Sequence, residues 1–271
     1  MRALNIDPNA KVAVVTGASG GIGRALSIEL LGKNHDMQVV AIGRNQAKLD
    51  EVVNAFPNRV TAIACDLTST KEREALLTSL KALSQIDFLI HCAAMIHPLK
   101  QLSDISEDEW QVAQTLNIDV PLFMTTALLP KMKNGRVMFL TSDSELQPVV
   151  GAGPYCINKS ALHMMWQCLK AEYQGTQNNI KNRYSSKSIH FGLVAPGNVD
   201  TSMQQAIRET DKAILPLAPL LEQAYRQGQL LKPEYVAQFL RWLLCEVDSE
   251  QYSQKIWNIY AELSHQNWLK A

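Results

Sequence analysis

The stretch that decides the fold is KVAVVTGASGGIGRALSIELL, residues 11–31. Its first six residues, Lys11–Thr16, form a short β-branched run that is typical of a buried strand. Apolar residues then recur at helical spacing from Ile22 to Leu30. A glycine-rich turn that leaves a strand and opens a helix presents free backbone N–H groups to a phosphate. The stretch therefore predicts a strand, turn and helix that bind a dinucleotide.

Similar strand and helix patterns alternate along the rest of the chain. Further strands are expected at residues 38–42, 60–65, 88–92, 136–141, 189–195 and 256–260, and further helices at 46–55, 71–83, 107–131, 155–173 and 233–245. Continuous apolar strands between amphipathic helices predict an α/β fold, a Rossmann-type doubly wound parallel sheet of about seven strands with helices on both faces. Residues 1–271 contain no internal repeat or linker, so a single dinucleotide-binding domain is expected.

Two segments are expected to lie outside this alternation. Residues 174–188 are polar and are expected to form a surface loop. Residues 201–230 lie between the sixth strand and the last long helix, where a substrate lid is expected.

Composition excludes several classes of function. The 271 residues are 46% hydrophobic and 19% charged, with a net charge of zero, so neither nucleic acid nor an anionic membrane surface is an expected partner. The N-terminus has no apolar signal region, and no run of about 18 apolar residues predicts a membrane span. The five cysteines have no CxxC spacing, which predicts reduced thiols in a cytoplasmic protein. No cluster of histidines with acids or cysteines predicts a metal site.

The end of the second strand indicates which dinucleotide binds. A carboxylate there bonds the ribose 2′-hydroxyl of NAD and repels a 2′-phosphate. This chain has Gly43, Arg44 and Asn45 instead, and a guanidinium binds phosphate well. The sequence therefore favours NADP(H), held at its phosphates by Arg44, Asn45 and the turn residues Gly17, Ser19, Gly20, Gly21, Ile22 and Gly23.

A candidate catalytic pair lies on the helix expected at residues 155–173. Tyr155 and Lys159 are four residues apart and so share a helix face. A tyrosine alone is a poor acid–base catalyst, because its unperturbed pKa is about 10. A cation beside it favours the phenolate and is expected to lower that pKa toward the working pH. Ser142 stands thirteen residues before Tyr155, and the nearby Ser144 fits this spacing less well.

These residues resemble the short-chain dehydrogenase/reductase family over almost the whole chain. The motif TGxxxGIG stands at residues 16–23, and Asn117, Ser142, Tyr155 and Lys159 match the family's catalytic tetrad. The resemblance implies that Tyr155 donates a proton to the substrate carbonyl oxygen and that Ser142 positions this oxygen. It further implies that Lys159 bonds the nicotinamide ribose and that Asn117 holds a water linking Lys159 to bulk solvent.

The resemblance also implies the remaining cofactor contacts. They are expected at Asp66, Leu67, Ala93, Pro196, Gly197, Val199, Thr201 and Met203. Where the family has Asn-Asn-Ala-Gly after the fourth strand, this chain has HCAA at residues 91–94, which is expected to change local hydrogen bonding. Members commonly assemble through long helices, so a homodimer or homotetramer is expected.

Within the family, the run APGNVDTSMQQ at residues 195–205 resembles sepiapterin reductases and bacterial benzil (diketone) reductases. Sepiapterin reductases anchor the pterin with an aspartate near the C-terminus, where this chain has Asn258. Asn258 is expected at the pocket floor, with Ser142, Tyr155 and Gly197 as the other substrate contacts. A neutral amide cannot form an ion pair, so Asn258→Asp is expected to improve turnover of sepiapterin relative to benzil.

The sequence thus predicts an NADPH-dependent carbonyl reductase acting on a vicinal diketone or a pterin-like side-chain ketone. One alternative is a 3-oxoacyl or hydroxysteroid-type reductase, which the short C-terminus after Tyr260 disfavours. Another is a non-catalytic NADP-binding regulator, which would have no use for Tyr155 and Lys159 together.

Overall fold

The computed structural model describes residues 6–7, 9–174, 188–261 and 268. In this part of the chain, all strands belong to one parallel sheet with the order β3-β2-β1-β4-β5-β6-β7. The strands are β1 (Lys11–Thr16), β2 (Met37–Gly43), β3 (Val60–Ala64), β4 (Phe88–His91), β5 (Arg136–Leu140), β6 (His190–Ala195) and β7 (Ile256–Asn258).

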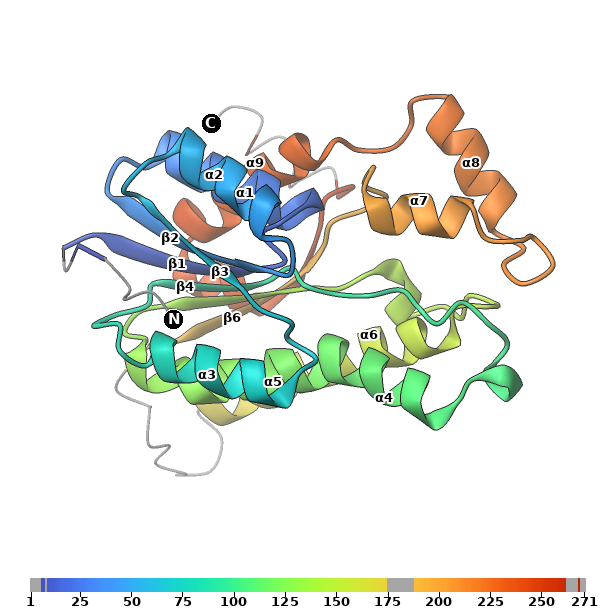
Figure 1. Ribbon diagram of the computed structural model, residues 1–271, viewed down its shortest axis with the longest axis horizontal. Coiled ribbons are helices and arrows are strands. Elements are labelled where there is room, and N and C mark those ends of the chain that lie inside the picture. Colours follow the sequence, from blue (N-terminus) through green and yellow to red (C-terminus); the bar gives the residue numbers. More distant parts are fainter. Residues whose placement is uncertain (1–5, 8, 175–187, 262–267, 269–271) are drawn as a thin grey trace.

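Helices cover both faces of the sheet (Figure 1). One layer contains α1 (Gly21–Lys33), α2 (Gln46–Ala55) and α9 (Pro233–Cys245). The opposite layer contains α3 (Thr70–Leu80), α4 (Glu107–Gln114), α5 (Val120–Leu128) and α6 (Gly153–Gln174). A short helix α10 (Ser249–Gln254) precedes β7. The predicted doubly wound α/β fold is confirmed.

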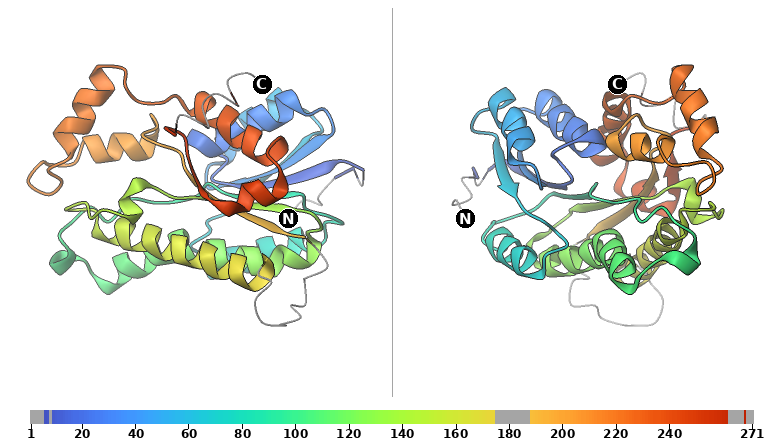
Figure 2. Two further views of the ribbon diagram at one scale, coloured as in Figure 1. Left: turned by 180° about the vertical axis from the view of Figure 1, so that it is seen from behind. Right: turned by 45° about the vertical axis from the view of Figure 1, so that its right-hand side comes forward.

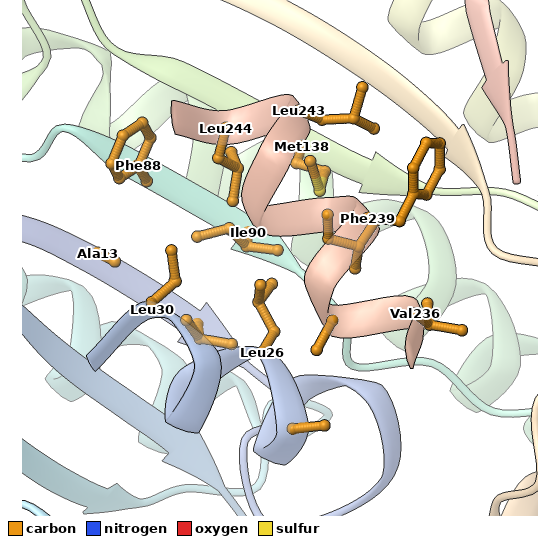
Figure 3. Packing of buried hydrophobic residues seen from close by; sticks show 14 of the residues in the cluster. Ala13, Leu26, Leu30, Phe88, Ile90, Met138, Val236, Phe239, Leu243 and Leu244 are labelled. Carbon is orange, nitrogen blue, oxygen red and sulfur yellow. The ribbon is translucent and has the colours of Figure 1, made fainter. Parts of the chain in front are cut away.

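Each central strand sends alternate side chains into two hydrophobic cores, because successive residues of a strand face opposite sides. On β1, Ala13 and Val15 belong to the core under α1 and α9, whereas Val12 and Val14 belong to the core under α3, α5 and α6. Figure 3 shows the first core, where Leu26 and Leu30 of α1 and Phe239 and Leu243 of α9 gather over Ile90 and Met138.

The strand order reverses between β1 and β4, which are neighbours in the sheet. In open parallel sheets this switch point leaves a crevice at the carboxyl ends of the strands, where ligands bind. The glycine turn leaves the carboxyl end of β1 in that position. The fold therefore places the predicted dinucleotide turn at the site where such a sheet accepts a ligand.

The segment predicted as a lid contains two helices, α7 (Ser202–Arg208) and α8 (Ala218–Arg226). They stand out beyond the layered body at one end of the molecule, in orange in Figures 1 and 2. Thr201 caps α7, its Oγ1 accepting a hydrogen bond from the Gln204 amide at 3.3 Å. Most of the residues predicted as the loop 174–188 lie outside the described part of the chain.

Residues 107–131 form one helical run of 25 residues that includes a π-helical turn, Thr115–Asp119. Its length and composition would allow it to cross a membrane, but buried core helices meet the same two criteria. Val120, Met124 and Leu128 of this run are buried beneath the sheet. The helical run 107–131 is therefore apolar because it packs in the core of the protein.

Candidate active site

The glycine turn is shaped by close backbone contacts. Gly17 has a φ of 71°, and a Cβ atom there would lie 2.8 Å from the backbone nitrogen of Ala93. A Cβ atom on Gly23 would lie 2.5 Å from the Gly17 carbonyl oxygen. These two positions therefore require glycine, one for its left-handed conformation and one for the approach of α1 to the turn.

The N-terminus of α1 fits an anionic ligand. Its N-cap, Gly20, offers no side-chain hydrogen bond, and the first turn contains no acidic residue. No side chain of the N-cap or the first turn therefore accepts a hydrogen bond from the first N–H groups of α1. These N–H groups and the positive end of the helix dipole are left for a ligand. The residues present fit the pyrophosphate of a dinucleotide, with Gly20, Gly21, Ile22 and Gly23 supplying backbone donors.

The residues predicted at the adenosine end lie at the carboxyl ends of β2 and β3. Arg44 is exposed, and Asn45 caps α2 by accepting a hydrogen bond from Lys48 N at 3.1 Å. Asp66 accepts bonds from the amide and hydroxyl of Thr68, which lower its pKa, and the charge of Arg44 lowers it further. The next residue, Leu67, is buried in the core, so only its backbone can contribute here. Ser19 lies against Gly43, since a Cβ there would meet the Ser19 hydroxyl oxygen at 2.6 Å.

A cavity of about 400 Å³ opens beside the turn. The predicted residues that line it are Ile22, Ser142, Tyr155, Lys159, Pro196, Gly197, Val199, Thr201 and Met203. Apolar side chains complete much of its wall: Ile96, Leu99, Val149, Ile207, Leu215, Leu217 and Leu221. The structure thus brings a few polar groups and many apolar side chains together around one cavity, which is the usual composition of a small-molecule site.

The catalytic candidates meet at the start of α6. Lys159 Nζ lies 5.3 Å from the centre of the Tyr155 ring and donates a hydrogen bond to the Leu140 carbonyl at 2.7 Å. Ser142 interacts with the Tyr155 side chain through a hydrogen bond. The Ser142 hydroxyl also donates to the Ser144 hydroxyl at 3.1 Å, so both serines belong to one short network.

The expectation that Lys159 lowers the pKa of Tyr155 is wrong for this site. Burial raises the pKa of Tyr155 to about 12, and a hydrogen bond with the Ser142 side chain only partly opposes this rise. Burial also lowers the pKa of Lys159 to about 8, although the charge of Glu145 opposes that change. Burial thus disfavours the charged form of each side chain, so the Tyr155 phenol is neutral at this site.

Asn117 occupies the π-helical turn and is buried. Its side-chain oxygen accepts a hydrogen bond from Met95 N at 3.0 Å, and its amide nitrogen donates to Met95 O at 3.0 Å. Both polar atoms therefore clamp the chain after β4, and Asn117 does not line the cavity.

Asn258 is not one of the residues that line the cavity, contrary to the expectation that it forms the pocket floor. Its amide nitrogen donates to Asp143 Oδ1 at 3.3 Å, and its oxygen accepts from Tyr260 N at 2.9 Å. Asp143, which follows Ser142 in the chain, does line the cavity. A carboxylate is therefore present beside Ser142, at a position that the sequence analysis did not indicate.

Two of the altered residues after β4 have definite roles. His91 stacks on Phe139 at 5.2 Å, shares a hydrogen bond of 2.9 Å with Thr125, and is held neutral because burial lowers its pKa to about 3. Cys92 lines the cavity, and burial raises the pKa of its thiol to about 12. The exchange thus replaces polar amides by a packed ring and an unreactive thiol.

Buried Glu145 also belongs to the site, although the sequence analysis missed it. Its carboxylate accepts a hydrogen bond from Thr141 and lies 3.5 Å from His163 Nδ1. Its side chain is only 3% exposed, and its charge acts on Lys159. The position of Glu145 in the sequence does not distinguish it from a surface glutamate. Its effect on Lys159 becomes visible only in the folded structure.

Comparisons with known proteins agree with this geometry. A family model described as short chain dehydrogenase matches residues 11–212. A benzil reductase of Bacillus cereus that forms (S)-benzoin is 28% identical over 255 residues, covering 90% of this chain and 96% of that protein. A rabbit protein (Oryctolagus cuniculus) named dehydrogenase/reductase SDR family member 4 is 31% identical over 248 residues, covering 89% of each.

A solved structure, that of the KRED1-Pglu enzyme, superposes with a TM-score of 0.80 at 26% identity, covering 91% of this chain and all of that one. Family members bind a nicotinamide dinucleotide and act on small molecules. The glycine turn, the Ser142–Tyr155–Lys159 group and the matched 202 residues lead to one conclusion. This chain belongs to the short-chain dehydrogenase/reductase family and is an oxidoreductase that interconverts hydroxyl and carbonyl groups.

Proposed function

We propose that the protein is an NADPH-dependent reductase that converts one carbonyl of a vicinal diketone into a hydroxyl group. The observation that carries this proposal is a cavity with a largely apolar wall that Ser142, Tyr155 and Lys159 line together. Two carbonyl groups between apolar substituents suit a wall of aliphatic side chains with a few converging donors. The similarity to a benzil reductase over nearly its whole length supports the same substrate class.

The side chains divide the chemistry as follows. NADPH supplies a hydride to the carbonyl carbon, and the developing alkoxide needs both stabilisation and a proton. Ser142 donates a hydrogen bond to this oxygen, and Tyr155, held neutral by its raised pKa, transfers its phenolic proton. Lys159 bonds the nicotinamide ribose and stabilises the resulting phenolate, while Asn117 holds the chain after β4 in place.

The preference for NADPH over NADH rests on Arg44. It is exposed at the carboxyl end of β2, where no carboxylate stands to repel a 2′-phosphate. A lost charge-assisted phosphate contact costs about 1.5–3 kcal/mol. Arg44→Ala should therefore weaken NADPH binding by about ten- to a hundredfold and NADH binding little. Equal weakening of both cofactors in a fluorescence titration would reject the assignment.

A pterin-like side-chain ketone is the second candidate substrate, and Asp143 is the observation that favours it. Its carboxylate lines the cavity and accepts a hydrogen bond from Asn258. This charge can bind the N–H edge of a pterin, the role that the neutral Asn258 cannot fill. Asp143→Asn should then reduce sepiapterin turnover more than benzil turnover, whereas Asn258→Asp would place two carboxylates together and help neither.

A screen of NADPH oxidation tests the proposed function directly. The panel contains benzil and other diketones, sepiapterin, quinones and 3-oxoacyl thioesters. The proposal expects the highest kcat/KM with a diketone. Highest activity with a 3-oxoacyl thioester would replace it, and no turnover of any carbonyl would favour a non-catalytic cofactor-binding role.

We further propose that the protein forms a homodimer or homotetramer and acts in the cytoplasm as a single-domain enzyme. Exposed apolar side chains on α5 and α6, such as Phe123 and Met164, support the assembly. All five cysteines are free thiols, which suits a reducing compartment.

A further inference from the structure

One polar side chain in the lid-side wall of the cavity has no role in the chemistry described above. Gln204 lies in the first turn of α7, lines the cavity and is only 6% exposed. Its neighbours in this wall, Met203, Ile207 and Leu215, are apolar. A buried amide among such residues is unfavourable unless its polar atoms are paired.

Only one end of this amide is paired. Its oxygen accepts a hydrogen bond from Arg208 Nη1, whereas its nitrogen, Nε2, is buried without a hydrogen-bond partner among the described residues. Arginine only donates hydrogen bonds, so the oxygen, and not the nitrogen, must face Arg208. Arg208 lies on the far side of this wall, where it lines a separate cavity of about 830 Å³. The N–H groups of Gln204 are therefore not used by Arg208, and since Gln204 lines the substrate cavity, a ligand bound there is the partner that these buried N–H groups lack.

The orientation of the amide is fixed because Arg208 is itself held from several sides. Its Nη1 lies 3.4 Å from Asp200 Oδ1, and its Nε lies 3.5 Å from Glu222 Oε2 of α8. The guanidinium also stacks 3.8 Å from the centre of the Tyr225 ring, and the side chain of Arg208 is only 8% exposed. These contacts join the residue before α7 to α8 and leave the guanidinium little freedom to release Gln204.

We propose that Gln204 determines substrate specificity by donating a hydrogen bond from Nε2 to the second oxygen of a vicinal dicarbonyl, the one that is not reduced. This inference rests on the proposed function. Ser142 and Tyr155 serve the reacting oxygen, so Gln204 supplies the donor for the other oxygen in the same cavity. Gln204 forms and breaks no covalent bond, and Arg208 acts through it as a positioning residue. A site with such a donor discriminates against a substrate that lacks the matching acceptor.

The test compares benzil with deoxybenzoin, in which a methylene group replaces one carbonyl. Benzil is intrinsically the more reactive ketone, so the measured quantity is the change in the kcat/KM ratio between the two substrates on substitution. In Gln204→Leu this ratio should fall by about tenfold, mainly because benzil turnover declines. The matched control is Gln205→Leu, since Gln205 is exposed and bonds to Glu209 at 2.7 Å. That variant should leave the ratio unchanged.

Two further variants separate recognition from folding. Gln204→Glu keeps an oxygen toward Arg208 but replaces the donor by an acceptor, so the ratio should fall at least as far as in Gln204→Leu. Arg208→Met should lower the ratio by releasing the amide, and Arg208→Lys should restore part of it by donating to the same oxygen. An equal loss for both substrates in all variants would show that Gln204 only packs α7, and would overturn the inference.

The outcome for the wild type distinguishes the two proposals. If the enzyme reduces neither compound nor any other diketone, the proposed function fails and the inference fails with it. If it reduces benzil but the ratio in Gln204→Leu and Gln204→Glu equals that of the wild type, the function stands and the inference alone is rejected.

Discussion

At the scale of single residues, the proposed reaction depends on Tyr155 as a neutral proton donor. Tyr155→Phe retains the ring and removes only the proton donor. Turnover should fall by about two to four decades, the usual contribution of general acid–base catalysis, while NADPH affinity changes little. Stopped-flow reduction and a fluorescence titration measure the two effects. Near-normal turnover in this variant would exclude Tyr155 as the acid.

The buried, charged amine of Lys159 is expected to lower the stability of the folded protein. Burial lowers the pKa of Lys159 from an ordinary 10.5 to about 8. While the amine is charged, its burial therefore lowers the free energy of unfolding by about 3 kcal/mol. The cost is fully present below pH 8, where both folded and unfolded chains are protonated. It is relieved as pH rises from about 8 to 10.5, because the native state releases its proton first.

The stability of the Lys159→Met variant should therefore exceed that of the wild type most at neutral pH. The difference in Tm between this variant and the wild type should shrink as pH rises from 7 to 10. Loss of the hydrogen bond to Leu140 contributes a second change, but this bond is made by either form of the amine. Thermal unfolding over this range, without cofactor, measures the trend. A difference that stays constant or widens would mean that Lys159 is not charged and desolvated at neutral pH.

Sequence reasoning predicted which side chains the candidate site brings together, but not their electrostatics. Ser142, Tyr155 and Lys159 carry recognisable types at recognisable spacing, and all three line the cavity. The pKa of Tyr155 depends on burial by residues from other segments, which spacing does not report. The contact between Asp143 and Asn258 joins residues 115 positions apart, so it appears only when β7 is placed at the edge of the sheet.

At the scale of secondary structure elements, the turn and α1 are fitted to each other at Gly23. Gly23→Ala places a methyl group 2.5 Å from the Gly17 carbonyl oxygen, so α1 must shift or the turn must open. A backbone clash of this kind should lower Tm by several degrees, roughly 1–3 kcal/mol of stability. Gly20→Ala is the matched control for Tm, because Gly20 has extended backbone and no atom within 4 Å of the added methyl group. A similar Tm for both variants would contradict this account.

The elements that the sequence analysis missed are the shortest ones. Helices α7, α8 and α10 have 7, 9 and 6 residues, too few for a helical period to emerge clearly. The long elements are easier to recognise, because the buried strands are continuous apolar runs and the helices pack one face on the sheet. Residues 201–230 were expected to cover the substrate, and Met203, Ile207 and Leu217 from this segment do line the cavity.

At the scale of the whole molecule, α6 exposes an apolar stripe to solvent. Ile157 and Met164 are 45% and 58% exposed on one helix face, and Phe123 on neighbouring α5 is 54% exposed. These exposed apolar side chains are the surface through which we propose that the protein assembles. We expect Met164→Glu to shift sedimentation velocity toward a smaller species, whereas Lys33→Glu, on the opposite layer, should not. Identical sedimentation of the wild type and Met164→Glu would remove this face from the interface.

The thiol of Cys92 has a consequence for the working lifetime of the enzyme. Vicinal diketones are electrophiles, and a cysteine attacks them only as the thiolate. Burial raises the pKa of Cys92 to about 12, so its thiol stays protonated at neutral pH. An electrophile can therefore occupy the cavity through many cycles without becoming covalently trapped on its wall.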